Sequence, residues 1–276
     1  MKTILGQIFE VKRSRVDAAK RGVDLERLAV MARDLRQKGT SHRFRRALDS
    51  QERINVIAEF KRASPSKGVI NDGVDPSAIA RAYRSGGAAA ISVLTEEDFF
   101  KGSLDDLLAV REEVSLPILR KDFIFDDFQV YESALAGADA ILLIVGGLNA
   151  DDLGRLRSLV ENDLGMDALV EVHTSQEMRV ALDSGAKLIG VNNRNLKTFE
   201  VSLDVSRQLG EIAPQDVTLI SESGLGSHRD IAELARLGYR GFLIGETLMR
   251  SDDPQASLRR LMRNEEVIRD ANYEIT

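Results

Sequence analysis

The chain has 276 residues, of which 43% are hydrophobic and 30% charged, and this is enough for one large buried core. Its formal net charge of −6 gives no overall attraction to nucleic acid or to anionic membranes, so any anion site must be built locally. The absence of cysteine excludes disulfides, thiolate nucleophiles and cysteine-based metal sites, and it fits a reducing compartment.

The beginning of the chain and its apolar runs predict a cytoplasmic protein. Glu10 and Lys12 appear before an apolar signal-peptide core can build. The longest strongly apolar run, residues 140–145, is far shorter than the roughly 20 residues that span a bilayer. We therefore expect neither a membrane nor a nucleic-acid partner. The oligomeric state stays open, with a monomer as one expectation.

The first part of the chain, residues 8–46, is rich in Arg, Lys, Ala and Leu at helical spacing and predicts one or two helices before the first strand. We take this N-terminal extension to be residues 1–48. Two placements of its helices are open. The helices could close the bottom of the fold, or they could lie beside its top and cover a substrate.

Short apolar runs then alternate with longer charged segments of helical period. Eight runs read as strands buried on both faces. They are residues 55–60, 89–94, 117–121, 138–145, 168–172, 188–192, 217–222 and 241–245. Eight strand–helix units predict a single α/β domain, a (β/α)8 barrel over residues 54–270. A doubly wound sheet is the alternative, but no Gly-x-Gly-x-x-Gly turn follows the first strand.

The helix boundaries carry recognisable signals. Asp75 followed by Pro76 reads as an N-cap and first helical position. Ser103, Thr174 and Ser227 each precede an acidic residue by three positions, as in a capping box. Glycines expected as helix C-caps are Gly86, Gly87, Gly137, Gly165, Gly185 and Gly238.

Charged and amide side chains follow the apolar strands at the end where the chemistry of barrels is located. They are Glu59, Lys61, Lys121, Glu171, Asn192 and Glu222. One such residue would usually be a charge leaving the core for solvent. Several strands that deliver charges of alternating sign to the same end favour a paired cluster with general acids and bases. The three histidines are expected to be structural or solvated.

Two small-residue turns after the last two strands predict an anion site. Residues 221–227 and 244–247 let backbone N–H groups approach a phosphate, and a short helix from Glu246 would point its N-terminus at the same place. Either turn alone would be an ordinary glycine turn, whereas the pair favours phosphate. Ser64, in a loop after the first strand, could bind phosphate or simply start the turn.

These segments together resemble one family, the indole-3-glycerol-phosphate synthases of tryptophan biosynthesis. The resemblance covers residues 1–260 and begins with VIAEFKRASPS at residues 56–66. It continues through residues 94–96, 100–103, 119–123, 170–172, 190–196, 221–224 and 243–246. It implies a decarboxylating, dehydrating ring closure of 1-(2-carboxyphenylamino)-1-deoxyribulose 5-phosphate to indole-3-glycerol phosphate, with no metal or organic cofactor.

The resemblance also implies roles for single residues. Lys121 would be the general acid and Glu171 the general base. Lys61 would pair with the substrate carboxylate and could serve in the dehydration. Glu59, Asn192 and Glu222 would hold the lysines and substrate hydroxyls. Phosphate would be bound by Ser64, Ser223, Gly224, Gly245 and the backbone of Glu246, with Phe100 and Arg194 at the rim. Glu246 stands where some members have serine, which removes a hydroxyl contact.

Three alternatives stay open at this point. The first is a phosphoribosylanthranilate isomerase or similar sugar-phosphate isomerase, which would share the phosphate turns. The second is a Schiff-base lyase with Lys121 as nucleophile. The third is a non-catalytic barrel that serves as a scaffold. Which lysine acts at which step is not decided by the sequence.

Overall fold

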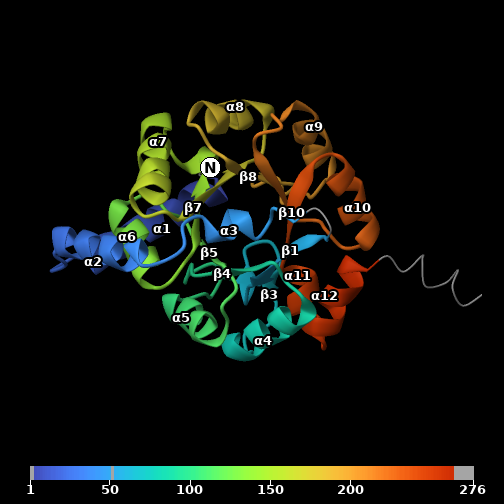
Figure 1. The fold of residues 1–276 in the computed structure, drawn as a ribbon, viewed down its shortest axis with the longest axis horizontal. Helices are drawn as coiled ribbons and strands as arrows, with labels where there is room; N and C mark the ends of the chain where they lie inside the picture. The colour runs from blue at the N-terminus through green and yellow to red at the C-terminus, as the bar shows by residue number, and fades with distance from the viewer. Residues whose placement is uncertain (1–2, 51–52, 264–276) are drawn as a thin grey trace, which may run out of the picture.

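The computed structural model describes residues 3–50 and 53–263, and within them eight parallel strands close into a barrel (Figure 1). The strands follow one another around the ring in chain order, and the last one pairs with the first. They are β1 (Asn55–Phe60), β4 (Ala90–Leu94), β5 (Ile118–Lys121), β6 (Ala140–Ile144), β7 (Asp167–Val172), β8 (Leu188–Asn192), β9 (Thr218–Glu222) and β10 (Tyr239–Ile244). The predicted barrel is confirmed, and the doubly wound alternative is wrong.

The strand boundaries agree with the prediction to within two residues. β1 and β8 have the predicted limits. The largest differences are in β6, which begins two residues late, and β10, which begins two residues early and ends before Gly245. The predicted C-terminal limit of the barrel, residue 270, lies outside the described residues.

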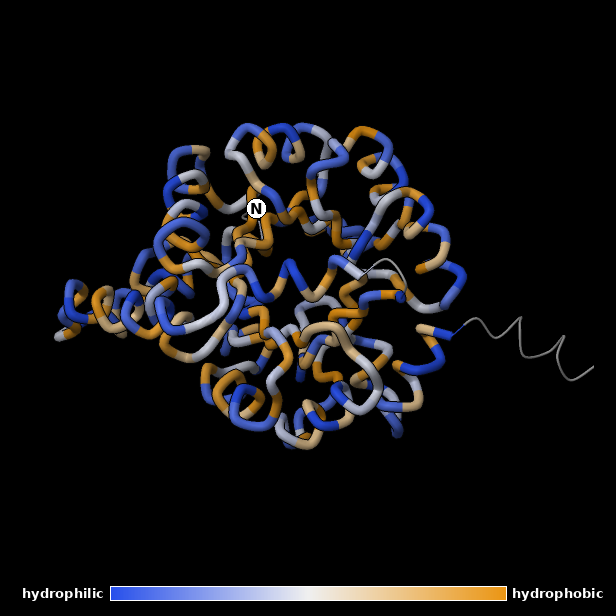
Figure 2. Tube along the Cα trace, in the orientation of Figure 1, coloured by the Kyte–Doolittle hydropathy of each residue, from blue (hydrophilic) through white to orange (hydrophobic). Residues whose placement is uncertain are grey.

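Each strand divides its side chains between two apolar layers, because successive residues point to opposite faces. Ile57, Leu119, Leu169 and Ile220 belong to the cluster that fills the inside of the ring. Their neighbours, such as Val56, belong to the layer between strands and helices. Figure 2 shows this apolar ring inside a more polar outer shell. The charged residues at the strand ends continue the same alternation as the inward-pointing apolar residues. Their side chains therefore point into the barrel mouth.

Helices cover the outside of the ring. They are α4 (Pro76–Gly86), α5 (Leu104–Glu113), α6 (Asp127–Leu135), α7 (Ala150–Ser158), α8 (Ser175–Asp183), α9 (Asp204–Ile212), α10 (His228–Arg236), α11 (Glu246–Met249) and α12 (Pro254–Met262). Three shorter elements interrupt the pattern: the hairpin of β2 (Ala63–Ser64) with β3 (Gly68–Val69), the 3-10 turn η1 (Val145–Gly147) and the π-turn η2 (Leu159–Asp163).

The predicted helix caps are present with the exception of Gly86. Asp75, Ser103, Thr174 and Ser227 each accept a hydrogen bond from the first turn of their helix. Gly87, Gly137, Gly165, Gly185 and Gly238 all have positive φ, whereas Gly86 is the last residue of α4. Of the three predicted capping boxes, the one at Ser227 is reciprocal, whereas Asp106 pairs with Arg62 and Glu177 accepts a hydrogen bond from His173.

The N-terminal extension forms three helices instead of the expected one or two, and they take both of the placements left open. α1 (Ile4–Ala19) lies at the mouth, where Ile8 and Phe9 join the inner apolar cluster. α3 (Arg43–Arg46) closes the opposite end, where Phe44 and Leu48 enter the same cluster. Figure 1 shows α3 over the centre of the ring.

The remaining helix of the extension, α2 (Leu25–Gln37), lies outside the ring beside α6 (Figure 1). Among the described residues, no helix is both long enough and apolar enough to cross a membrane.

Candidate active site

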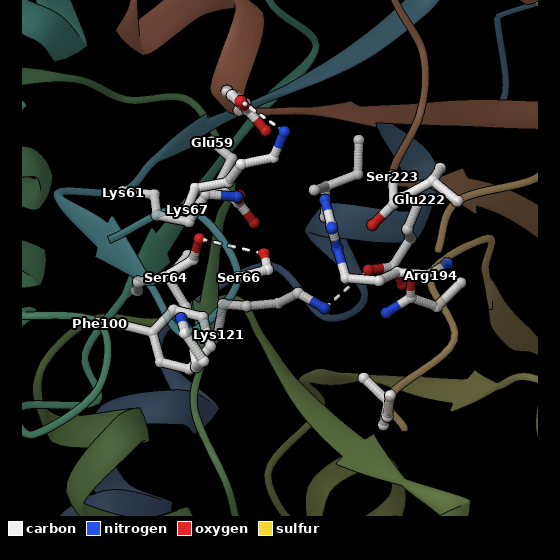
Figure 3. Close-up of a pocket in the computed structure, with 18 of the residues that line it drawn as sticks. Glu59, Lys61, Ser64, Ser66, Lys67, Phe100, Lys121, Arg194, Glu222 and Ser223 are labelled. Atoms are coloured by element: carbon white, nitrogen blue, oxygen red, sulfur yellow. Dashed lines mark hydrogen bonds and ion pairs between the residues drawn. The ribbon is translucent and has the colours of Figure 1, made fainter. Parts of the chain in front are cut away.

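A cavity of about 500 Å³ opens where the strands end in the mouth of the barrel. Every residue that the sequence marked as catalytic or binding lines this cavity, and Figure 3 labels eight of them. They are Glu59, Lys61, Ser64, Phe100, Lys121, Glu171, Asn192, Arg194, Glu222, Ser223, Gly224, Gly245 and Glu246. The structure therefore brings the predicted set together, while the role of each residue stays a prediction.

Lys121 lies at the centre of the charged group. Its Nζ is 2.7 Å from Glu171 Oε2 and 2.6 Å from Glu222 Oε2 (Figure 3). Burial alone would lower the pKa of Lys121, but the negative charges of Glu171, Glu222 and Glu59 outweigh it and raise this pKa above its ordinary value. Lys121 is consequently held in its protonated form, as a proton donor must be.

The two carboxylates that hold Lys121 differ in their proton affinity. Burial opposes ionisation of both. For Glu171 the charges of Lys121 and His173, together with a hydrogen bond from Asn192, outweigh the effect of burial and lower the pKa. For Glu222 burial dominates, and the negative charges of Glu171 and Glu59 add to it, so its pKa rises to about 7. Glu171 is therefore the carboxylate that is ionised and available as a base at neutral pH.

The absence of a side chain at Gly190 makes room for Glu222. A Cβ at Gly190 on β8 would overlap Oε1 of the Glu222 carboxylate. That oxygen is buried and has no hydrogen-bond partner among the described residues. The close approach of backbone to carboxylate thus contributes to the burial that raises the pKa of Glu222.

A second ion pair joins Lys61 and Glu59 on the other side of the cavity. The two residues are two apart at the end of β1, and both point inward as the strand period requires. Gly245 is needed beside them, because a Cβ there would overlap the Glu59 carboxylate. Lys61 lies in the part of the mouth that is next to β2, within reach of an anionic group in the cavity.

The turns predicted to hold a phosphate form one side of the cavity. Ser223 has φ +67° and Gly224 has φ +81°, so two successive residues adopt the left-handed conformation after β9. α11 begins at Glu246, as predicted. Ser64 reaches the same cavity from β2, and its Oγ is 3.5 Å from that of Ser66 (Figure 3).

Two cations beside these turns were not singled out from the sequence. Lys67 Nζ is 3.4 Å from Glu246 Oε1, and Arg250 Nε is 3.2 Å from the same oxygen. Both residues line the cavity. Lys67 belongs to the loop that contains Ser64, and Arg250 is four residues after Glu246, so proximity to the phosphate turns was the signal available. Glu246 therefore forms ion pairs with both cations.

Part of the cavity wall is apolar. Ile4, Leu5 and Ile8 of α1 contribute to it, together with Phe100. The Phe100 loop is fixed by Glu96, whose carboxylate accepts hydrogen bonds from the backbone N–H groups of residues 98–100. This wall offers a flat aromatic group a place to pack.

The histidines agree only partly with expectation. His42 bonds Asp167 at the closed end of the barrel, and His228 bonds the Leu261 carbonyl, as structural residues do. His173 instead lies behind a residue of the cavity, where its Nε2 is 3.5 Å from Glu171 Oε1. The strand period contained this signal, because residues 171 and 173 share a face.

Comparison with known proteins gives one consistent family. The family model described as indole-3-glycerol phosphate synthase matches residues 5–261. An indole-3-glycerol phosphate synthase of Carboxydothermus hydrogenoformans is 46% identical over 266 residues, covering 94% of this chain and 99% of that protein. One of Desulfosudis oleivorans is 45% identical over 262 residues, covering 95% and 99%.

Solved structures show the same architecture at low sequence identity. A thiamine phosphate pyrophosphorylase from Pyrococcus furiosus superposes with a TM-score of 0.56 at 14% identity, covering 79% of this chain and 96% of that one. This likeness supports the barrel fold alone.

Proposed function

Because the chain belongs to the indole-3-glycerol phosphate synthase family, the carboxy-lyases of tryptophan biosynthesis, we propose that its cavity carries out the family's ring closure with Lys121 as general acid and Glu171 as general base. The substrate is 1-(2-carboxyphenylamino)-1-deoxyribulose 5-phosphate, and the products are indole-3-glycerol phosphate, carbon dioxide and water.

One observation carries the assignment of roles: a protonated Lys121 lies between two carboxylates, one with a lowered pKa and one with a raised pKa. Ring closure needs a proton delivered to the ketose oxygen, and restoration of the aromatic ring needs a base for the final proton. Lys121, whose pKa is raised, suits the first step. Glu171, whose pKa is lowered, suits the second.

The cavity has a separate place for each end of the substrate. Lys61 would bind the carboxylate that leaves as carbon dioxide, after exchanging its present partner Glu59 for the substrate. The aromatic ring would pack on the apolar wall of α1 and Phe100. The phosphate would lie on the turns at Ser223 and Gly245, with Ser64 above it. Asn192 and Glu222 would then face the sugar hydroxyls.

The remaining alternatives fit less well. A Schiff-base mechanism needs a neutral amine at Lys121, whereas the surrounding carboxylates raise the pKa of that amine. An isomerase would share the phosphate turns, but the family match favours the synthase. A scaffold would have no use for three inward carboxylates, because buried charges cost folding free energy.

A direct assay tests the proposal. The purified protein is incubated with the carboxyphenylamino deoxyribulose phosphate, and the appearance of indole fluorescence is followed together with release of carbon dioxide. We expect both signals at equal rates. Folded protein that produces neither would overturn the proposed function, and an adduct trapped by borohydride would favour the Schiff-base mechanism.

Four further expectations belong to this proposal. The chain would act as a single domain, without a metal or organic cofactor, as a monomer, and in the cytoplasm. Size-exclusion chromatography with light scattering and activity after exhaustive chelation would test the second and third of these.

A further inference from the structure

His173 follows β7 directly and occupies a position that the reaction scheme leaves without a role. Its imidazole Nε2 is 3.5 Å from Glu171 Oε1, and its Nδ1 is 3.3 Å from Glu177 Oε2 on α8. Nε2 is buried and has no hydrogen-bond partner among the described residues. The imidazole thus lies between the proposed general base and a second carboxylate outside the cavity.

Glu177 fixes the orientation of this imidazole. Its Oε2 also accepts the backbone N–H of His173 at 2.6 Å, so one carboxylate oxygen holds both the main chain and the ring. Glu177 is in turn held by the first turn of α8, where its N–H donates to Thr174 Oγ1. The end of β7 and the start of α8 therefore form a rigid unit that presents Nε2 to Glu171.

The charges with the largest effect on His173 are negative. Glu171 faces it from β7, Glu177 from α8 and Glu222 from β9, while Lys121 of β5 lies on the other side of Glu171. Burial opposes protonation of the ring, but these carboxylates outweigh it and raise the pKa of His173. A charged imidazole in turn helps to lower the pKa of Glu171, second to Lys121.

The two oxygens of Glu171 consequently have different partners. Oε2 receives Lys121, at 2.7 Å, on the side of the cavity. Oε1 faces His173 on the side of α8. Without the imidazole, Oε1 would be a buried oxygen without a cation, and Glu171 would retain a proton at a higher pH.

We propose that His173, oriented by Glu177, is a positioning residue for Glu171 whose imidazole faces Oε1 and keeps the carboxylate ionised while Oε2 serves the reaction. This inference rests on the proposed role of Glu171 as general base. It adds a Glu171–His173–Glu177 series, in which Glu171 lines the cavity and His173 and Glu177 are not among its lining residues.

The pH dependence of kcat separates this role from a merely structural one. In His173→Gln, glutamine can still hydrogen-bond but cannot carry charge, so the acid limb of kcat should move upward by about one pH unit. On that limb kcat should fall about tenfold, while KM stays within about twofold. Glu177→Gln keeps an acceptor for the main chain but removes a charge that supports the imidazolium. It should move the limb in the same direction by less.

His42→Gln is the matched control, because His42 pairs with Asp167 at the other end of the same strand, with 3.1 Å between Nδ1 and Oδ1. Its pH profile should equal that of the parent. If His173→Gln and Glu177→Gln leave the acid limb in place, with or without a lower rate, the inference is wrong. If His173→Gln does not fold, the limb in Glu177→Gln decides alone. If the parent protein itself has no activity on the substrate, the proposed function is wrong.

Discussion

Lys12 in α1 and Asp122, directly after β5, form a buried ion pair with 2.9 Å between Nζ and Oδ2. Arg120 and Thr95 bind the same carboxylate oxygen. Burial would raise the pKa of Asp122, but the charges of Arg120 and Lys12 outweigh it and lower the pKa. Because Asp122 follows Lys121, this pair ties the N-terminal helix to the strand that carries the proposed acid.

Replacing Lys12 by Met should therefore affect both stability and substrate binding. A buried carboxylate loses one of its cations, so the free energy of unfolding should fall by about 2–4 kcal/mol. The apolar wall supplied by α1 should loosen, which raises KM more than it lowers kcat. Urea denaturation and steady-state kinetics measure the two effects.

The control for Lys12→Met is Arg15→Met on the same helix. Arg15 pairs with Asp98, but its side chain is 47% exposed, so the loss should stay below about 1 kcal/mol. Equal effects of the two substitutions on stability and KM would contradict the anchoring role of Lys12.

Lys121→Ala should nearly abolish turnover. Loss of a positioned general acid costs on the order of 10²–10⁴ in rate, whereas the phosphate turns and the apolar wall are left in place. Binding of the product, followed by fluorescence titration, should therefore stay within a few fold of the parent. Lys187→Ala removes an exposed lysine paired with Asp216 and should leave turnover unchanged. A kcat of Lys121→Ala within tenfold of the parent would mean that the acid is misassigned.

Glu222→Gln should lower kcat and raise the free energy of unfolding at neutral pH. The folded-state pKa of Glu222 is about 7 against an ordinary 4.5, so its contribution to stability is fully present below 4.5 and lost as the pH rises through about 7. Relative to the parent, the variant should gain free energy of unfolding over that window, up to about 3 kcal/mol. Its kcat should fall, because Lys121 loses a partner.

Chemical denaturation at pH 4.5 and pH 8 measures this difference. Glu211→Gln, at an exposed residue of α9, should show a much smaller change between the two pH values. A stability difference between Glu222→Gln and the parent that is the same at both pH values would refute the raised pKa.

Glu246→Ser should strengthen phosphate binding. The Glu246 carboxylate now occupies Lys67 and Arg250, and its negative charge faces the turns proposed for phosphate. Removing it should lower KM and the inhibition constant of inorganic phosphate by about fivefold, which corresponds to about 1 kcal/mol. Glu246→Gln keeps the shape and should show most of the gain. Weaker phosphate binding in both variants would show that the carboxylate does not compete with the phosphate.

The barrel, and the end of it at which the chemistry lies, could be predicted from the residue pattern. Eight buried runs with glycine-capped helices between them leave few other arrangements, and the two-residue period of a strand decides which side chains point inward. Glu59, Lys121 and Glu222 therefore had to meet at the mouth once the ring closed. The phosphate turns followed from their place after the last two strands.

The pairing of these groups, in contrast, depends on how the folded chain packs. Lys121 is 50 residues from Glu171 and 101 from Glu222, and no local pattern encodes such pairs. The same is true of Lys12 and Asp122, 110 residues apart, which place α1 at the mouth while α3 closes the other end. The strand period puts His173 on the same face as Glu171, but only the packing of α8 against β7 places the imidazole between Glu171 and Glu177. Proton affinities depend on such packing, since burial and facing charges set them.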